Sequence, residues 1–352
     1  MPEPLKLQEI KQRMATFGLR PHRKFGQNFL ADFNLLRAVV ADAQVGPEDC
    51  VLEIGMGAGS LTGLLCDSAG LVISVEMDRG MFEFSREVLE GCTNLVQVRC
   101  DALSRSGLNA ELEALLRGIL AGGEIAASAP AGNDFQVVSN LRGPAAPCRG
   151  MKVVANLPYS VATAILFALL ESRLPLERML VMVQHEVGEK LSARPGDPEW
   201  GLPGLMLSRL ATARMIRKVP SRVFWPRPRV DSALVEIRPH EPGAVDMAAF
   251  ARLRALAHLL FQHRRKSAAN AMAIALGIGN ARAAGWLLDA GADPGARTED
   301  LAPGALQSLS DRLDIQAMVR KAHSSSQEQV LDRAEKRARR SAWKKRVYGE
   351  SS

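Results

Sequence analysis

The sequence has little cysteine and no paired cysteine motif. Its five cysteines are odd in number and scattered, and no two of them form a Cys-x-x-Cys pair, so we expect neither a disulfide framework nor a zinc site. The histidines are dispersed in the same way, and His185 followed by Glu186 lacks the second histidine of a zinc-protease helix. We therefore interpret the cysteines as reduced core residues and expect no metal centre.

Long apolar runs are also missing. No uncharged apolar stretch reaches the length of about 18 residues that a membrane-spanning helix needs. The first residues mix Glu3, Lys6 and Glu9 with apolar positions, unlike a signal peptide. A chain of 352 residues that is 47% hydrophobic can bury a full core and an accessory module. We expect a soluble, cytoplasmic, monomeric protein of two domains that does not associate with membranes.

The excess of positive charge is concentrated at the C-terminus. The net charge is +7, and residues 318–352 contain ten Lys or Arg residues against four Asp or Glu residues. Composition alone leaves two interpretations of this basic tail open. It is either a solvated, flexible end or an arm that contacts nucleic-acid phosphates.

Short apolar segments alternate with helical patterns through most of the chain. Strands are predicted at 51–54, 71–75, 95–98, 151–155, 179–184 and 232–237. This alternation is typical of a mostly parallel sheet with helices on both faces. It predicts a doubly wound, Rossmann-like α/β domain.

Changes in composition suggest where the domains end. Residues 118–150 are rich in Ala, Gly, Ser and Pro and lose helical periodicity, so we interpret them as a low-complexity surface insertion. A second break near residue 240 precedes several helical segments. We expect a catalytic α/β domain over 1–240, a small all-helical domain over 241–317 and a basic, flexible tail over 318–352.

Three consecutive strand ends carry residues suited to an adenosyl cofactor. The segment from Glu53 to Gly59, Glu-Ile-Gly-Met-Gly-Ala-Gly, follows a strand and opens a helix, so Gly55 and Gly57 allow the backbone to approach a nucleotide closely. The glycine spacing, G-x-G-x-G, differs from the G-x-G-x-x-G of dinucleotide-binding loops, and the loop lacks the Gly-Lys-Ser/Thr ending of triphosphate-binding loops. Glu76 ends the next strand, where a carboxylate can accept hydrogen bonds from both ribose hydroxyls. Asp101 ends the third strand, although a single acid there could also be a helix cap.

The tetrapeptide Asn156-Leu157-Pro158-Tyr159 follows the fourth strand. An amide oxygen and a backbone carbonyl held by a stiff proline turn can accept both hydrogens of an aromatic amine, and a tyrosine can stack on its ring. Such a pattern indicates methylation of an adenine amine. A plain β-turn is the alternative from these four residues alone.

Together these motifs resemble those of the ribosomal RNA adenine dimethyltransferase family, in its bacterial small-subunit branch. The resemblance runs from about Arg20 to Leu313, outside the insertion. Its most specific blocks are Arg23-Lys-Phe-Gly-Gln-Asn-Phe-Leu30, Glu53-Ile-Gly-Met-Gly-Ala-Gly-Ser-Leu-Thr62, Asn156-Leu-Pro-Tyr159, Phe224-Trp-Pro-Arg-Pro-Arg-Val-Asp-Ser232 and Phe261-Gln-His-Arg-Arg-Lys266.

The resemblance implies a class I methyltransferase that uses S-adenosylmethionine, and it assigns roles to individual residues. It implies cofactor contacts for Gln27, Asn28, Leu30, Gly55, Gly57, Glu76, Asp101, Ala102 and Asn156. The catalytic residues would be Asn156, Leu157, Pro158, Tyr159 and Phe224, with Phe224 sandwiching the target base against Tyr159. RNA contacts are implied for Arg227, Arg264, Arg265 and Lys266, the last three on a helix of the 241–317 domain, which we therefore expect to bind RNA or the ribosome. With an RNA substrate, we favour auxiliary RNA contact for the basic tail. One departure is Cys100 before Asp101, where the family usually has glycine.

The resemblance also implies the substrate. The family methylates both amine positions of two adjacent adenosines in the 3′-terminal hairpin loop of 16S ribosomal RNA, within a pre-30S particle. Three alternatives stay open: a large-subunit RNA adenine methyltransferase, a DNA adenine methyltransferase and a non-catalytic assembly factor. Leu157 speaks against DNA, since those enzymes more often carry Asn-Pro-Pro-Tyr. Intact Asn156, Tyr159 and Glu76 favour an enzyme.

Overall fold

The computed structural model describes residues 7–21, 27–123, 135–141, 150–241 and 243–313. They divide into two compact units, the first within Met1–Ala193 and Met206–Ala244, the second within Arg194–Leu205 and Val245–Ser352. The short segment 194–205 therefore groups with the second unit and not with the α/β part, where we expected it. Each unit is described by itself.

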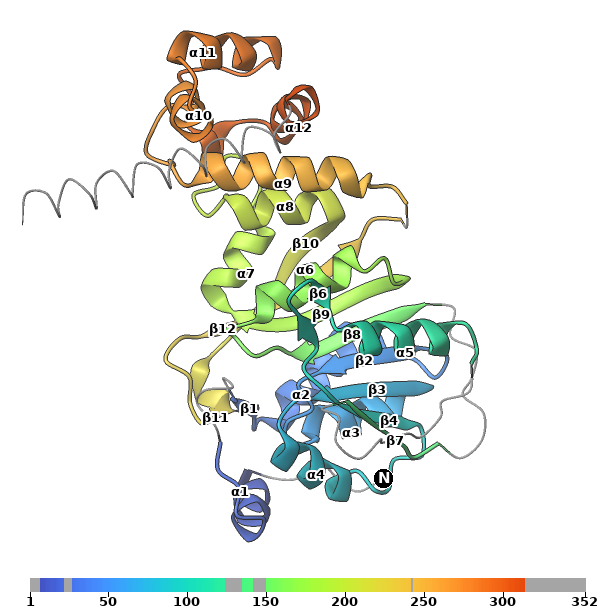
Figure 1. Cartoon of the computed structure of the whole chain (residues 1–352). Helices are drawn as coiled ribbons and strands as arrows, with labels where there is room; N and C mark the ends of the chain where they lie inside the picture. The colour runs from blue at the N-terminus through green and yellow to red at the C-terminus, as the bar shows by residue number, and fades with distance from the viewer. Residues whose placement is uncertain (1–6, 22–26, 124–134, 142–149, 242, 314–352) are drawn as a thin grey trace, which may run out of the picture. The chain divides into compact units, whose positions relative to one another are not determined.

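The first unit is built on an eight-stranded sheet in the described part of the chain, in the order β10-β12-β9-β8-β2-β3-β4-β7 (Figure 1). Strands β9, β8, β2, β3 and β4 are parallel, and β12, β10 and β7 are antiparallel to their neighbours. Their bounds are β2 Cys50–Ile54, β3 Leu71–Glu76, β4 Leu95–Arg99, β7 Gln136–Ser139, β8 Met151–Asn156, β9 Leu176–Gln184, β10 Ala211–Val219 and β12 Ser232–Pro239.

Helices cover both faces of this sheet, as a doubly wound fold requires. One face packs against α5 (Ala110–Leu120), α6 (Ala162–Glu171) and α7 (His185–Ser192). The other packs against α2 (Phe33–Ala43), α3 (Ser60–Ser68) and α4 (Arg79–Val88). Every residue of β2 and β3 is buried, because a central parallel strand is covered on both sides.

Side-chain caps fix the starts of several of these helices. Asp32 accepts a hydrogen bond from the backbone of Leu35 at the start of α2, and Asp78 does so from Met81 at the start of α4. Each cap satisfies a backbone N–H that the first helical turn leaves unpaired. The helix starts are therefore set locally by the sequence.

Short elements complete the first unit. The helix α1 (Leu7–Thr16) precedes β1 (Phe29–Leu30), which pairs with β11 (Phe224–Trp225) after the short helix η2 (Ser221–Val223), and β5 (Leu103–Ser104) pairs with β6 (Gly107–Leu108). α8 (Leu202–Leu210) begins in the second unit and ends in the first.

Two features of the sheet differ from the sequence-based expectation. The interval 118–150 is not wholly an irregular insertion: α5 continues to Leu120, and β7 pairs with β4. The remaining residues, 124–134 and 142–149, lie outside the described residues. The edge strand β10 was missed because its partly exposed sequence carries arginine, lysine and threonine instead of an apolar run.

The second unit is helical. It contains α9 (Met247–Phe261), α10 (Ala268–Leu276), α11 (Asn280–Asp289), the short helix η3 (Thr298–Asp300) and α12 (Pro303–Arg312). Its core is formed by buried side chains that include Phe250, Leu253, Met272, Leu287 and Leu306. Within the described residues no single helix is long and apolar enough to span a membrane, and α10 with α11 passes that test only as a pair bent by 118°. The expected tail, 318–352, lies outside the described residues.

Candidate active site

A pocket opens at the carboxyl ends of the parallel strands of the first unit. Its empty volume, with the open mouth included, is about 730 Å³. The predicted residues among those that line it are Gln27, Asn28, Gly55, Gly57, Glu76, Asp101, Ala102, Asn156, Leu157, Pro158 and Tyr159. The alternating pattern predicted this meeting point, because parallel strands present their ends at one edge of the sheet.

The glycine loop after β2 is shaped for a close backbone approach. Gly55 has a φ of +90° and Gly57 a φ of +53°, conformations that favour glycine. A Cβ atom on Gly57 would lie 3.1 Å from the Phe29 ring. The loop and Phe29 therefore leave room for the flat backbone only, and that cradle fits an adenosyl cofactor.

Glu76 presents a buried carboxylate to the pocket. Its two oxygens accept hydrogen bonds from the backbone N–H of Gly57 at 3.0 Å and of Asp78 at 2.9 Å. Burial raises the pKa of Glu76, while these two donors oppose the increase. Held this way, each oxygen keeps a lone pair that a ribose hydroxyl could approach.

The amide of Asn156 is held by the segment that precedes β1. Its Nδ2 donates a hydrogen bond to the carbonyl oxygen of Asn28 at 2.8 Å. This contact fixes the amide plane and so the direction of Oδ1, the acceptor end. The backbone N–H of Leu157 donates to the carbonyl of Met182 at 3.2 Å, which ties the turn to β9.

Tyr159 is anchored by its hydroxyl group. The hydroxyl lies 2.5 Å from Oγ of Ser232, the first residue of β12. Burial raises the pKa of the Tyr159 phenol, and the contact with Ser232 opposes the increase. The phenol therefore stays protonated at neutral pH, and its ring is held at the pocket wall.

Comparison with known proteins places the chain in a family. Residues 18–313 match the family model described as ribosomal RNA adenine dimethylase. The chain belongs to the ribosomal RNA adenine dimethylase family. A relative from Moorella thermoacetica, named Ribosomal RNA small subunit methyltransferase A, is 36% identical over 84% of this chain and 93% of its own length. A relative of the same name from Streptomyces griseus is 36% identical over 83% of this chain and 89% of its own length.

Two solved structures share the fold. The crystal structure of the 23S rRNA methyltransferase ErmE is 26% identical, with a TM-score of 0.53 over 82% of this chain and 100% of that chain. A dimethyladenosine transferase from Plasmodium falciparum is 19% identical, with a TM-score of 0.57 over 80% and 95%. The predicted family and fold class are confirmed, and as a ribosomal RNA adenine dimethylase the chain is an S-adenosylmethionine-dependent methyltransferase.

Some residues to which the family resemblance gave roles lie apart from the main pocket. Leu30 lines an adjoining hollow instead. Phe224 lines neither space, since its side chain is 4% exposed and packs in the apolar core with Leu30 and Leu36. The expectation that Phe224 faces Tyr159 across the pocket is therefore not met in this structure, because pairing of β11 with β1 directs its ring into the core.

The basic residues implied for RNA contact are exposed, with one correction. Arg227 is exposed, and its Nε donates to Oγ of Ser221. The expectation of a helix at 264–266 is wrong, because α9 ends at Phe261 and the chain turns before α10. Arg264 forms an ion pair with Glu299 at 2.7 Å, and Arg265 and Lys266 are exposed.

Sequence reasoning missed several residues of the pocket. Met77 and Val161 line it although they are large, apolar and 45% and 37% exposed. Exposed apolar side chains at a pocket mouth suit a flat aromatic ligand. Cys100 also lines the pocket, and burial raises the pKa of its thiol to about 12, so it is no thiolate nucleophile at neutral pH.

We expect Gly57→Ala to weaken binding of S-adenosylmethionine by about tenfold or more. In free energy, a tenfold change in affinity corresponds to roughly 1.4 kcal/mol. Alanine is strained at this φ, and its methyl group would push on Phe29. Gly18→Ala is the matched control, because Gly18 has a φ of +67° but nothing within 4 Å of the added Cβ. Calorimetric titration with the cofactor measures both. Equal affinities in the two variants would refute the close approach at Gly57.

A second carboxyl, that of Glu53, lies beneath the glycine loop and carries no ion-pair partner in the contacts described. It is 1% exposed, and Oε2 accepts hydrogen bonds from the hydroxyls of Thr62 and Ser74, each at 2.6 Å. Burial raises the pKa of Glu53 to about 8, against the lowering effect of these two donors. Glu53 is therefore mostly protonated at neutral pH.

This shifted pKa predicts a pH-dependent stability. Between the ordinary pKa of 4.5 and the folded value of about 8, the folded protein holds a proton that the unfolded chain releases. The free energy of unfolding should therefore fall as pH rises through this window, by up to about 1.4 kcal/mol per pH unit from this group. Glu53→Gln should remove that fall. Denaturant unfolding of both proteins at several pH values checks this, and parallel pH curves would contradict it.

Proposed function

We propose that this chain transfers methyl groups from S-adenosylmethionine to the exocyclic amines of two adjacent adenosines in the 3′-terminal hairpin loop of 16S ribosomal RNA. The substrate is proposed to be a pre-30S particle, and the protein to act as a cytoplasmic monomer. The observation that carries the proposal is that Asn156 and Tyr159 share one pocket with Gly57 and Glu76. The names of the curated relatives, which specify the small subunit, support the choice of RNA.

The residues of the site have distinct tasks in this proposal. When bound, the cofactor supplies a methyl group on a positively charged sulfur, which is already a strong electrophile. The backbone of Gly55 and Gly57 lies against the cofactor, and the carboxylate of Glu76 accepts hydrogen bonds from its ribose hydroxyls. Oδ1 of Asn156 and the carbonyl oxygen of Leu157 accept hydrogen bonds from the amine hydrogens, which turns the nitrogen lone pair towards the methyl group. As the N–C bond forms, the S–C bond breaks, and the nitrogen then gives one proton to solvent. Most of the rate gain then comes from alignment of the two reactants.

An adenine stacked in an RNA helix cannot enter such a pocket. The base has to be splayed from a loop or flipped, and stacking on an aromatic ring offsets part of the cost. Tyr159 provides that ring, and its hydroxyl contact with Ser232 keeps it from rotating away. The exposed Met77 and Val161 extend the apolar rim of the pocket.

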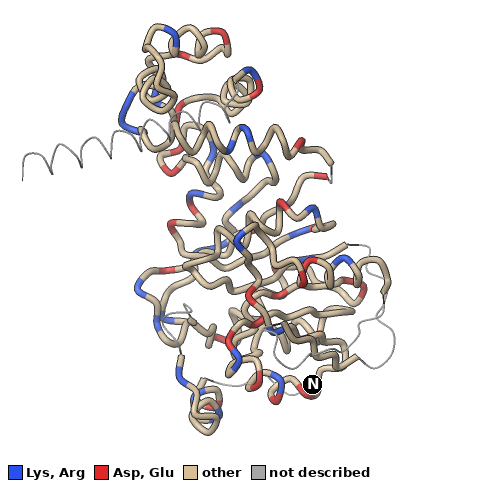
Figure 2. Tube along the Cα trace, viewed as in Figure 1, with Lys and Arg blue, Asp and Glu red and all other residues tan. Residues whose placement is uncertain are grey.

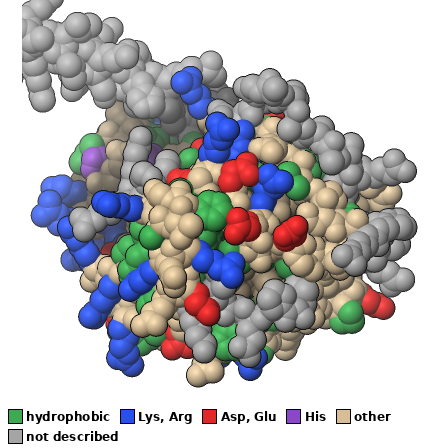
Figure 3. Space-filling view, turned by 90° about the horizontal axis from the view of Figure 1, so that it is seen from below, with side chains coloured by type: hydrophobic (Ala, Val, Ile, Leu, Met, Phe, Trp, Pro, Cys, Tyr) green, Lys and Arg blue, Asp and Glu red, His purple; other side chains and the backbone are tan. Residues whose placement is uncertain are grey.

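Exposed basic side chains lie on α1 and around β11 in the first unit. The exposed cations on α1 and around β11 are Lys11, Arg13, Arg222, Arg227 and Arg229. Figure 2 shows such residues along both segments, and in Figure 3 Lys and Arg side chains gather along one margin of the face seen from below. A surface of this charge supports binding of an RNA backbone.

The likeness to ErmE, which is named a 23S rRNA methyltransferase, makes large-subunit RNA the second candidate substrate. The test is to incubate the protein with labelled S-adenosylmethionine and, separately, with immature small subunits, protein-free 16S RNA, 23S RNA and DNA. We expect label in the small-subunit samples. Label in 23S RNA or DNA alone would overturn the proposal, and binding to small subunits without any label would identify a non-catalytic assembly factor.

A further inference from the structure

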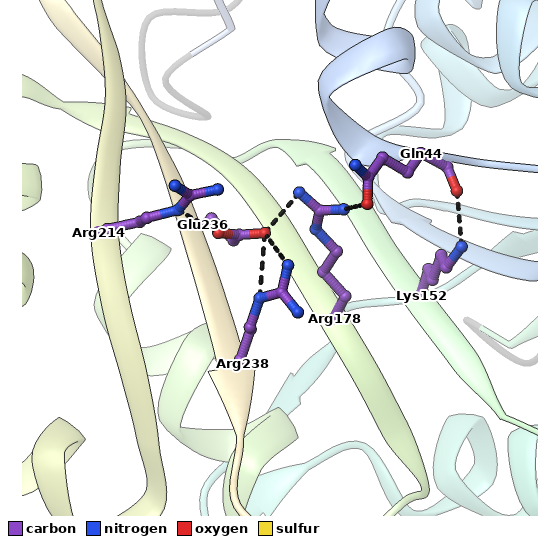
Figure 4. Close-up of polar contacts among 6 residues, drawn as sticks. All are labelled: Gln44, Lys152, Arg178, Arg214, Glu236 and Arg238. Atoms are coloured by element: carbon purple, nitrogen blue, oxygen red, sulfur yellow. Dashed lines mark hydrogen bonds and ion pairs between the residues drawn. The ribbon is translucent and has the colours of Figure 1, made fainter.

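A second cluster of functional groups lies in the first unit at the opposite edge of the sheet from the pocket. At its centre is Glu236 on β12, whose side chain is 2% exposed. It contacts three arginines, Arg178 on β9, Arg214 on β10 and Arg238 on β12. Figure 4 shows the three guanidinium groups converging on this one carboxylate.

The strand register brings these residues together. Arg214 is the cross-strand partner of Glu236, and Arg238 follows Glu236 by two residues on the same face of β12. Arg178 lies near the start of β9, directly beside Lys152 of β8. The pocket residues Asn156 and Leu157 come at the other end of β8, so the two sites occupy opposite ends of the same strands.

The buried part of the cluster is held by several paired contacts, and Nε of Arg178 is the buried nitrogen in it that has no hydrogen-bond partner among the described residues. Arg178 donates through Nη1 to Oε1 of Gln44 at 2.5 Å, and Lys152 forms an ion pair with Asp49 at 2.7 Å. Burial raises the pKa of the Glu236 carboxyl, but the contacts with its arginines outweigh this and hold its pKa below the ordinary range. One buried arginine is enough to balance the charge of Glu236.

The remaining charge faces solvent. The side chains of Arg214 and Arg238 are 68% and 57% exposed, although both contact the buried carboxylate. Nearby Arg217 is paired with Asp42, so that acid is matched by a cation of its own. Two guanidinium groups are thus held close together by a common anchor, with their outer N–H groups pointing away from it.

We propose that Arg214 and Arg238 form a binding site for phosphate groups of an RNA backbone, separate from the methylation pocket. This inference rests on the proposed RNA substrate and adds a second contact region to it. Guanidinium groups present a rigid fork of donors that matches phosphate oxygens, and the shared carboxylate fixes both side chains before RNA arrives. Arg178 already balances the charge of Glu236, so the two exposed arginines add a surplus of positive charge at this surface. When a folded RNA places one adenosine in the pocket, other parts of its phosphate backbone are available to contact Arg214 and Arg238.

The test measures RNA affinity as a function of salt for the double variant Arg214→Gln with Arg238→Gln. Affinity falls as salt rises, and each lost phosphate contact makes the plot of log affinity against log salt less steep by about 1. For the double variant we therefore expect the steepness to decrease by about 2. Affinity for protein-free 16S RNA at low salt should fall by roughly tenfold or more. Affinity for S-adenosylmethionine should stay the same, because the pocket is untouched.

A control variant and a second probe separate this site from general effects of charge and folding. Arg86→Gln with Arg117→Gln removes two partly exposed arginines, each paired with a single glutamate on its own helix, and should leave the slope unchanged. Thr212→Glu places an acid opposite Arg238 without touching Glu236, since Thr212 is exposed and pairs with Arg238. It should weaken RNA binding in a protein whose buried cluster is intact.

The possible outcomes are distinct. Weaker binding and a smaller salt slope in both probe variants, but not in the control, support the site. Unchanged binding in the probes, or an equal loss in the control, overturns it. A loss seen with whole small subunits but not with protein-free RNA would assign the surface to a ribosomal protein and overturn it also. Methylation by the wild-type protein is scored separately, so failure of the proposed function would be visible by itself.

Discussion

Asn156→Ala is expected to reduce the maximal rate of methylation by about 10²–10³-fold, the usual cost of removing one pre-oriented polar group from a reaction centre. The variant loses the Oδ1 acceptor, and it also loses the Nδ2 contact with the carbonyl of Asn28 that orients the amide. The amine can still enter the pocket, but its lone pair is no longer directed. Single-turnover methylation at saturating cofactor and RNA measures this step.

A matched control removes an asparagine with a similar contact elsewhere. Asn140 also donates through Nδ2 to a backbone carbonyl, that of Leu89, and does not line the pocket. Asn140→Ala should keep normal turnover. RNA affinity should be nearly the same in both variants, and an equal loss of RNA binding and turnover in Asn156→Ala would contradict the role assigned to Asn156.

Glu76→Gln is expected to weaken the binding of S-adenosylmethionine by about 10–100-fold, since a hydrogen bond to a charged group contributes roughly 1.5–3 kcal/mol. Both carboxylate oxygens of Glu76 accept backbone N–H groups, from Gly57 and Asp78. A glutamine must therefore turn its own NH₂ group towards one of these donors, and it also offers the ribose hydroxyls one acceptor fewer. Calorimetric titration with the cofactor measures the loss.

The control for this prediction is Glu83→Gln. Glu83 is partly exposed on α4 and pairs only with Arg86 in the contacts described, so its substitution should leave cofactor affinity unchanged. If Glu76→Gln also bound the cofactor normally, ribose recognition by Glu76 would be refuted.

The sequence pattern predicted the central strands and the position of the pocket for a definite physical reason. Runs such as Val51–Leu52 and Val72–Ile73 are buried on both faces, so their apolar character is continuous and easy to recognise. Parallel strands all end at one edge, and the residues after them meet there without any knowledge of side-chain packing. That is why Glu76 and Asn156 could be expected in one pocket.

Contacts between distant segments could not be predicted in the same way. Glu53 is contacted by Thr62, which lies on the adjoining helix, and by Ser74, which lies on the adjoining strand. Tyr159 contacts Ser232, which lies 73 residues away in the sequence. Their pairing depends on how the strands are ordered in the sheet. The same holds for Phe224, whose place in a motif suggested a stacking role, while the pairing of β11 with β1 places its ring in the core.

Asn156 and its neighbours are proposed to position adjacent adenosines of small-subunit RNA for methylation by S-adenosylmethionine. The most direct measurement is mass spectrometry of 16S RNA fragments after reaction of immature small subunits with the protein and S-adenosylmethionine. We expect two methyl groups on each of two adjacent adenosines in the 3′-terminal hairpin loop, and about 10²–10³-fold slower formation of this product with Asn156→Ala. Methylation at other nucleotides, or an unchanged rate of product formation with Asn156→Ala, would contradict this proposal.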